Sequence, residues 1–293
     1  MSELTQRWAV GLVAAPLALV IVFAGGAALA GLLAIASAIA AWEFYRIARA
    51  AGHAPMSDIG CALAGLTPLA VHAQYLGLFQ PRFGHFAMIL LVLLGLSLWT
   101  RGANGKPLAA VATTVLGILY TGGMLSFGYA LRYHDYAVGG ARLGSLDIAA
   151  GGVLLSLPVL LTWATDIGAF TVGRAVRGRK LMPSVSPGKT VSGAIGGVAA
   201  SVLLAWIYVR FALRPSAQLA MTSAGVVLFG VAISVAAQIG DLLESLFKRE
   251  AGVKDSSQLL PGHGGVLDRL DSLFFVLPTA HLLLGWLLIP APR

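Results

Sequence analysis

The sequence contains few charged residues. Only 11% of its 293 residues are charged, whereas 58% are hydrophobic, and the mean hydropathy is +0.84. A water-soluble fold of this length cannot hide so much apolar surface in its core. A water-soluble globular protein is therefore excluded, and we expect a protein that lies in a lipid bilayer.

Cysteine is scarce as well. The single Cys61 excludes an internal disulfide and a metal–thiolate cluster. The net charge is +8, but the basic residues form no long patch interleaved with aromatic residues, so nucleic acid is not an expected partner. They stand instead at the ends of apolar runs, which favours contact with anionic lipid headgroups or with an anionic substrate.

Long apolar runs recur along the whole chain, and runs of about 18 to 25 residues can cross a bilayer as helices. We expect an all-α, polytopic integral membrane protein with about nine transmembrane helices. Residues 1–293 form one membrane domain, with N-terminal spans in 1–150 and the spans that carry the polar site in 151–293. The expected spans are 8–24, 26–47, 58–78, 85–100, 108–132, 149–173, 190–213, 219–247 and 265–290.

Two sequence features bear on how these spans pack and end. Small residues such as Gly193 and Gly197 let neighbouring membrane helices approach closely. Glu43 stands near the end of the second expected span and is followed by Arg46 and Arg49. We interpret it as part of an interfacial ion pair with one of these arginines.

The distribution of basic residues predicts an orientation. When alternate loops are assigned to the two sides, 14 of the 20 lysines and arginines fall on one side and 6 on the other. By the positive-inside tendency the richer side faces the cytoplasm. That side carries the loop 174–189 and the stretch 248–269, so we expect a polar site at the cytoplasmic face. The membrane that we expect is a bacterial inner membrane.

Acidic residues gather near the end of the chain. Six of the 12 lie between residues 241 and 271: Asp241, Glu244, Glu250, Asp255, Asp268 and Asp271. Helical spacing places Ser245 and Lys248 on the same face as Asp241. An acid within a membrane span is costly unless paired, hydrated or bound to a cation, and a Glu244–Lys248 pair would leave Asp241 unexplained.

The acids on the two sides of this stretch suit a cation. Asp268 and Asp271 precede the last apolar run, where an N-terminal helix cap is one explanation. Oxygen ligands from Asp241 and Asp268 on neighbouring helices also suit Mg²⁺, which keeps waters and substrate phosphate oxygens in its shell. We therefore predict a magnesium site with Asp241 and Asp268 as ligands. The sequence leaves open whether a second cation binds.

Basic and glycine-rich residues lie between these acids. Backbone amides of a glycine-rich turn can approach phosphate oxygens without obstruction by side chains. His263 lies within this turn, among residue types that bind phosphate. The residues concerned are Lys248, Arg249, Lys254, Gly262, His263, Gly264 and Gly265.

A second polar cluster begins at Asp166, in an apolar span, and runs through a basic loop to the sequence SPGKT at Ser186–Thr190. The GKT triplet is not a nucleotide P-loop, because Pro183 occupies the position of the first glycine. Lys189 stays a phosphate-binding candidate. The basic residues between Arg174 and Lys180 are interpreted mainly as topology signals and headgroup contacts.

The spacing of polar residues resembles a known family motif. The pattern S-x-F-K-R, four residues, K-D-x-S and then L-P-x-H-G-G-V-x-D-R-L-D, from Ser245 to Asp271, is similar to the hallmark of the phosphatidate cytidylyltransferase (CDP-diacylglycerol synthase) family. DIGAF at Asp166 and SPGKT also resemble family elements, whereas Phe170 and the VSG triplet at 191–193 depart from them. By motif the resemblance covers roughly residues 160 to 275.

The resemblance implies an activity and a set of site residues. It implies transfer of a cytidylyl group from CTP to phosphatidate for phospholipid biosynthesis, giving CDP-diacylglycerol and pyrophosphate, with Mg²⁺ held by Asp241 and Asp268. CTP, phosphatidate and membrane lipids are the implied partners, and a homodimer stays open. The implied catalytic residues are Asp241, Lys248, Arg249, Lys254, Asp268 and Asp271. The implied substrate-binding residues are Asp166, Ser186, Lys189, Thr190, Ser245, Asp255, His263, Gly264, Gly265 and Arg269.

Three other functions share some of these features. A cation-coupled transporter also has acids within spans and glycine-interrupted helices, but it would place them at the bilayer midplane within inverted repeats. A CTP-dependent lipid kinase would share the nucleotide site but not the full motif. A CDP-alcohol phosphotransferase would need a D-G-x-x-A-R element, which the sequence lacks.

Overall fold

The computed structural model describes residues 16–102, 104–135, 140–143, 146–259 and 264–291. The chain divides into two compact units whose segments alternate along the sequence. The first unit includes Gly26–Tyr129 and Leu246–Leu270, and the second includes Val13–Gly25, Ala130–Ser245 and Asp271–Arg293. Whether both units belong to the single membrane domain expected from the sequence stays a prediction.

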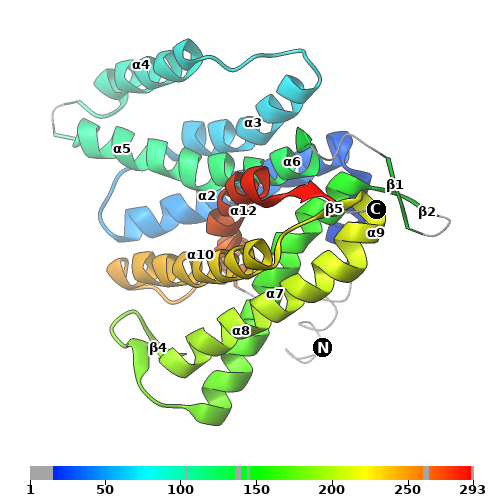
Figure 1. Cartoon of the computed structure of the whole chain (residues 1–293). Coiled ribbons are helices and arrows are strands. Elements are labelled where there is room, and N and C mark those ends of the chain that lie inside the picture. The colour runs from blue at the N-terminus through cyan, green and yellow to red at the C-terminus, as the bar shows by residue number, and fades with distance from the viewer. Residues whose placement is uncertain (1–15, 103, 136–139, 144–145, 260–263, 292–293) are drawn as a thin grey trace, which may run out of the picture. The chain divides into compact units, whose positions relative to one another are not determined.

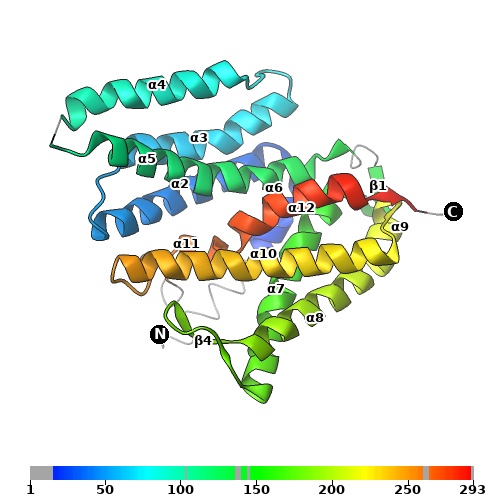
Figure 2. The same ribbon diagram turned by 60° about the vertical axis from the view of Figure 1, so that its left-hand side comes forward.

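The first unit consists of helices. They are α2 (Gly26–Ala50), α3 (Ser57–Tyr75), α4 (Phe83–Thr100), α5 (Pro107–Gly117), the π-helical turn η1 (Ile118–Gly123), most of α6 (Met124–Arg132) and the short α11 (Leu267–Leu270). Helices α2 and α3 lie side by side (Figure 2). The buried Tyr45 ring of α2 packs against Gly60 of α3 and Gly117 of α5, which have no Cβ: one built at either glycine would lie 2.3 Å from a Tyr45 atom.

The second unit combines long helices with three short antiparallel strand pairs. Its helices are α7 (Ala150–Val176), α8 (Val191–Tyr208), η3 (Val209–Leu213), α9 (Arg214–Ala217), most of α10 (Ser223–Glu250) and α12 (Leu273–Leu287). The strand pairs are β1 (Gly140–Leu143) with β2 (Leu146–Ala149), β3 (Lys180–Met182) with β4 (Ser186–Thr190), and β5 (Leu219–Ala220) with β6 (Ile289–Pro290).

Glycines bring α7 and α8 into close contact along their length (Figure 1). A Cβ on Gly193 would lie 2.7 Å from the carbonyl oxygen of Ala169, and one on Gly197 would lie 2.9 Å from that of Thr165. Real side chains do not tolerate such distances, so these positions need the absence of a side chain. The packing role predicted for both glycines is confirmed.

Seven helical segments in the described part of the chain are long and apolar enough to cross a membrane. They correspond to seven of the expected spans, within about four residues at each end. Helix α3 matches the expected span 58–78 but contains Asp58, His72 and Gln74 and is not among the seven. Of the span expected at 8–24, residues 8–15 lie outside the described part of the chain, and residues 16–24 form a helix.

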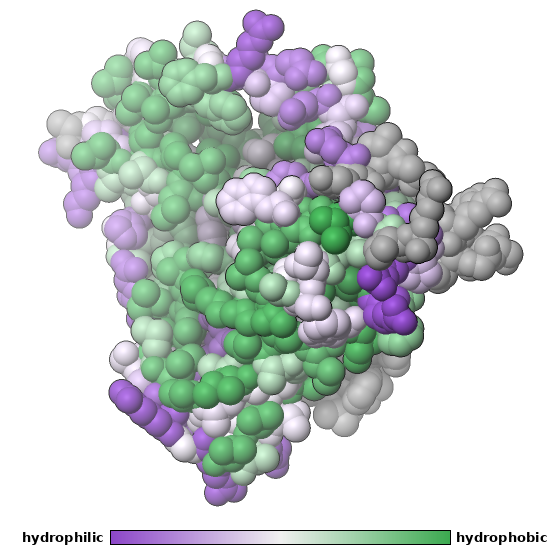
Figure 3. All heavy atoms as spheres, viewed as in Figure 1, coloured by the Kyte–Doolittle hydropathy of each residue, from purple (hydrophilic) through white to green (hydrophobic). Residues whose placement is uncertain are grey.

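Exposed side chains agree with a bilayer environment. Large hydrophobic residues are exposed on helices of both units, for example Phe86 on α4 and Ile195 on α8, and hydrophobic side chains cover much of the face drawn in Figure 3. Such surfaces are unfavourable in water. The structure therefore confirms an all-α, polytopic integral membrane protein, while the total of about nine spans stays a prediction.

Candidate active site

A hairpin in the second unit holds Lys189 at the start of a helix. Strands β3 and β4 pair antiparallel, and Thr190 ends β4 and caps α8 by accepting a 3.1 Å hydrogen bond from the Gly193 amide. Ser192 donates a hydrogen bond to the carbonyl of Arg177, which ties the helix start to the preceding turn. The SPGKT segment is thus a strand of a hairpin, which confirms that it is not a P-loop.

Lys189 forms an ion pair with Asp241. Its Nζ lies 2.5 Å from Oδ2 of Asp241, and the two side chains are 27% and 36% exposed. One turn earlier on α10, Gln238 donates to the Ala194 carbonyl of α8 at 3.3 Å. The structure therefore brings together two residues that the sequence proposed for separate roles, one for phosphate and one for metal.

A cavity of about 870 Å³ surrounds this pair in the second unit. Its walls are the later half of α7, the β3–β4 hairpin, the start of α8 and the later part of α10. Four basic and two acidic side chains line it: Arg174, Arg177, Lys180, Lys189, Asp166 and Asp241. The volume lies in the range of small-molecule sites, and the positive excess favours a polyanionic ligand.

In the first unit, Glu43 binds the loop that carries the family-like motif. Its side chain is fully buried. One oxygen accepts hydrogen bonds from the Ser257 hydroxyl at 2.5 Å and the Val266 amide at 3.1 Å, and the other from the Ser256 hydroxyl at 3.2 Å and the Leu267 amide at 2.6 Å. Four donors aimed at one carboxylate fix both ends of the loop.

The predicted ion pair of Glu43 is wrong. Arg46 lies on the exposed side of α2, with its guanidinium 5.7 Å from the centre of the Trp42 ring, and Arg49 donates to Ser57. Glu43 faces the interior because the hydrogen bonds from the loop replace the water that it would need. The signal in the sequence was a single acid in an otherwise apolar span, which is a functional indication by default.

Asp268, in α11 at the end of the same loop, binds this loop as well. Its Oδ1 lies 2.6 Å from Lys248 Nζ, and its Oδ2 accepts from the Gly265 amide at 2.8 Å and from both the amide and the hydroxyl of Ser256, at 3.1 and 2.8 Å. Gly265 must be glycine here, because a Cβ would lie 2.1 Å from the Ser256 hydroxyl and 2.4 Å from a Glu43 oxygen. The structure thus brings together Lys248, Asp268 and Gly265, which the sequence proposed for separate phosphate-binding and metal-binding roles.

The remaining predicted residues are more scattered. Asp271 accepts a 2.6 Å hydrogen bond from the Ser272 amide, but Ser272 is the residue directly before α12 and no side chain of a described residue caps that helix, so the helix-cap alternative is not supported. Gly264 has a φ of +78°, a conformation that favours glycine. His263 and Gly262 lie outside the described residues. Ser186 and Ser245 are partly buried, and four side chains are exposed: Arg249, Lys254, Asp255 and Arg269.

The carboxylates differ in how well they would suit a magnesium ion. No three Asp, Glu, His or Cys side chains in the described ranges come together as a ligand set. Mg²⁺ needs only one or two carboxylates when waters and substrate phosphates complete its shell. Asp241 fits this need, since it is partly exposed and lines the cavity. The Asp268 side chain is 8% exposed and already accepts four hydrogen bonds.

Asp241 and Asp268 belong to different units. Binding of one cation by both therefore stays a prediction, and Asp241 alone is supported by its surroundings as an available ligand. In this structure the ammonium group of Lys189 lies beside Oδ2 of Asp241, at the position where a bound cation would lie.

The fold and these clusters define an integral membrane protein with a positively lined cavity suited to phosphate-bearing ligands. The chain belongs to the cytidylyltransferase family, whose model matches residues 5–287. A Synechocystis protein named phosphatidate cytidylyltransferase is 31% identical over 292 residues, which cover 94% of this chain and 95% of that protein.

Two other relatives share a shorter, more similar segment. A Haemophilus influenzae phosphatidate cytidylyltransferase is 48% identical over 128 residues, and one from Bacillus subtilis is 44% identical over 126 residues. These alignments cover 44% and 45% of the relatives' own lengths. Sequence similarity to these two proteins is thus shown for less than half of their length.

Proposed function

We propose that this protein transfers the cytidylyl group of CTP to phosphatidate, releasing pyrophosphate and forming CDP-diacylglycerol for phospholipid biosynthesis. The observation that carries the proposal is the Lys189–Asp241 pair in the wall of a cavity whose charged side chains are mostly basic. Both substrates are anionic, and the family of the chain matches this chemistry.

The reaction replaces one phosphoanhydride bond of the α-phosphorus with another. A phosphate oxygen of phosphatidate attacks the α-phosphorus of CTP, and a new phosphorus–oxygen bond forms. The bond from the α-phosphorus to the oxygen that bridges to the β-phosphate breaks, and pyrophosphate leaves with that electron pair. Negative charge on these oxygens is neutralised best by positioned cations, a role that fits Lys189 and Arg174 in the cavity wall.

Mg²⁺ is part of this proposal, with Asp241 as the residue that would hold it. When bound, the ion would neutralise charge on the transferred and leaving phosphates. Lys189 would then leave the carboxylate and bind a phosphate oxygen, because its flexible side chain can reorient. A second cation, and a shared role for Asp268, stay predictions.

The motif loop of the first unit serves the same reaction as a prearranged element. Glu43 and Asp268 together accept hydrogen bonds from side chains and amides on both sides of the loop. A loop held in this way keeps Lys248 and the neighbouring glycine amides in a defined arrangement. Positioned groups of this kind contribute to rate by reducing reorganisation during the reaction.

We also propose that the protein lies in a bacterial inner membrane with its reaction site toward the cytoplasm. The asymmetry of lysine and arginine supports this orientation, as does the need for CTP, a cytosolic nucleotide. The relatives reported above are bacterial. A homodimer stays an untested prediction.

An Asp241→Asn variant tests the assignment of the cavity. Purified protein in detergent–lipid micelles with CTP, phosphatidate and Mg²⁺ should release pyrophosphate, and the variant should lose on the order of 100-fold in kcat, as expected for loss of a key charged group. Asp58→Asn, an exposed acid on α3, is the matched control and should keep its rate. A folded Asp241→Asn protein with a near-normal rate would refute the assignment.

A further inference from the structure

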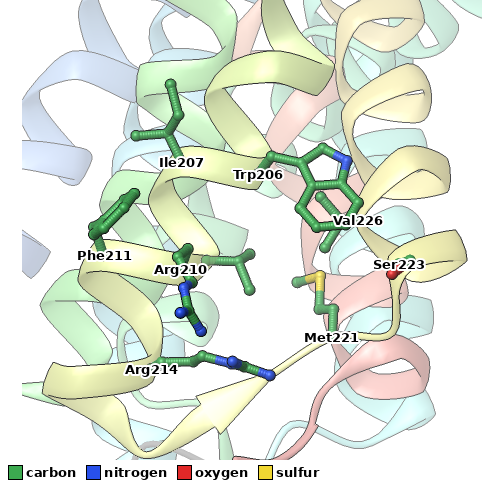
Figure 4. Close-up of a pocket in the computed structure, with 9 residues that line it drawn as sticks. Trp206, Ile207, Arg210, Phe211, Arg214, Met221, Ser223 and Val226 are labelled. Carbon is green, nitrogen blue, oxygen red and sulfur yellow. The ribbon is translucent and has the colours of Figure 1, made fainter.

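A second cavity lies at the other end of the helices that form the Lys189–Asp241 cavity. It has a volume of about 460 Å³ and lies within the second unit. Its lining comes from the end of α8, η3, the start of α9, the segment before α10 and the first turn of α10 (Figure 4). The lining residues include Trp206, Arg210, Arg214, Met221, Ser223 and Val226.

The separation of the two cavities matches the thickness of a bilayer. Nineteen residues separate Val191, at the start of α8, from Arg210, which corresponds to about 28 Å along a helix. On α10, eighteen residues separate Ser223 from Asp241, about 27 Å. The hydrocarbon core of a bilayer is roughly 30 Å thick. The second cavity therefore lies near the membrane boundary opposite the Lys189–Asp241 cavity.

Two arginines give this cavity a positive rim. Arg210 and Arg214 are one turn apart, and Figure 4 shows both side chains extending toward the same opening. Within the residues that the structure describes, neither guanidinium makes a hydrogen bond or an ion pair, and no acidic residue lines the cavity. Arg210 lies in η3, and such π-helical turns are frequent at functional sites.

The floor and flanks of the cavity are apolar. Met221 and Val226 are 6% and 2% exposed, whereas the neighbouring Trp206 and Phe211 are 45% and 71% exposed. A soluble anion would gain nothing from the exposed apolar side chains. A lipid would use both features, because its phosphate can bind the arginines while its acyl chains lie along the aromatic surface.

We propose that this cavity binds the headgroup phosphate of an anionic phospholipid from the leaflet opposite the Lys189–Asp241 cavity. Arg210 and Arg214 bind the phosphate oxygens, and Trp206 lies beside the part of an acyl chain that is nearest the headgroup. The site is separate from the cytidylyl transfer reaction, and its test measures lipid binding rather than activity.

Quenching of Trp206 fluorescence by brominated lipids tests this site. The protein is placed in nanodiscs that contain brominated phosphatidylglycerol or brominated phosphatidylcholine at equal mole fraction, and the Trp206 signal is obtained by subtracting that of Trp206→Phe. We expect stronger quenching by phosphatidylglycerol. Arg210→Gln and Arg214→Gln should each lower the preference for phosphatidylglycerol over phosphatidylcholine about five-fold. This is the effect expected for the loss of one basic residue near an anionic surface.

Arg82→Gln is the matched control, because it removes one exposed positive charge that does not line the cavity. It should leave the preference unchanged. Equal quenching by the two lipids, or an equal loss in Arg82→Gln, would overturn the proposal. A double variant, Arg210→Gln with Arg214→Gln, that loses self-association while keeping its lipid preference would assign the surface to a second copy of the chain instead.

Discussion

At the scale of single residues, the buried carboxylate of Glu43 is the main addition to the motif. A charged group removed from water is costly unless hydrogen bonds replace its hydration. Here four donors from Ser256, Ser257, Val266 and Leu267 do so. The same bonds make the loop conformation depend on a residue more than two hundred positions earlier in the chain.

A Glu43→Gln variant should lose both stability and activity. A glutamine keeps one acceptor oxygen, but its NH₂ group faces two donors that then have no acceptor. The free energy of unfolding should fall by about 2 kcal/mol, the cost of leaving buried donors unsatisfied. The thermal unfolding midpoint in detergent should fall. Because Glu43 positions the loop rather than contacting substrate, kcat should fall while the KM for CTP changes less.

The control for this prediction is Glu250→Gln. Glu250 belongs to the same unit, is 60% exposed at its side chain and lies 3.7 Å from His53, so the same chemical change should have little effect on either property. Equal behaviour of the two variants would contradict a positioning role for Glu43.

At the scale of elements, the contact between α7 and α8 determines where the cavity residues lie. Asp166 and Arg174 are on α7, and Lys189 directly precedes α8. The two helices approach closely because Gly168 and Gly196 face each other: a Cβ on Gly168 would lie 2.7 Å from the carbonyl oxygen of Gly196. A small change at this contact should therefore alter the cavity.

A Gly196→Ala variant should destabilise the protein and lower its activity. Its Cβ would lie 2.5 Å from Cβ of Val172, so the helices must separate, at a cost of about 1 to 3 kcal/mol for overpacking. The apparent unfolding midpoint and the rate of pyrophosphate release measure the two effects. Gly95→Ala on α4 is the matched control, because nothing lies within 4 Å of a Cβ there; an equal loss in both variants would disprove the packing argument.

At the scale of the whole molecule, the apolar runs predicted most of the described helices, because length and hydropathy alone decide whether a segment can cross a bilayer. The motif also identified Lys248 and Asp268 as candidate site residues, but the ion pair that the structure shows between them was not predicted. Glu43 could not be assigned in this way, since its partners are far away in the sequence and leave no local pattern. The contact between Lys189 and Asp241 could not be predicted either, because the two residues lie in separate polar clusters of the sequence.

The position of a radioactive phosphorus atom tests the central claim most directly. Purified protein is incubated with phosphatidate, Mg²⁺ and CTP labelled either at the α-phosphorus or at the γ-phosphorus, and the lipid and water-soluble products are separated. Cytidylyl transfer places the α label in the lipid product and the γ label in pyrophosphate. A CTP-dependent lipid kinase would place the γ label in the lipid, and that result would contradict the account.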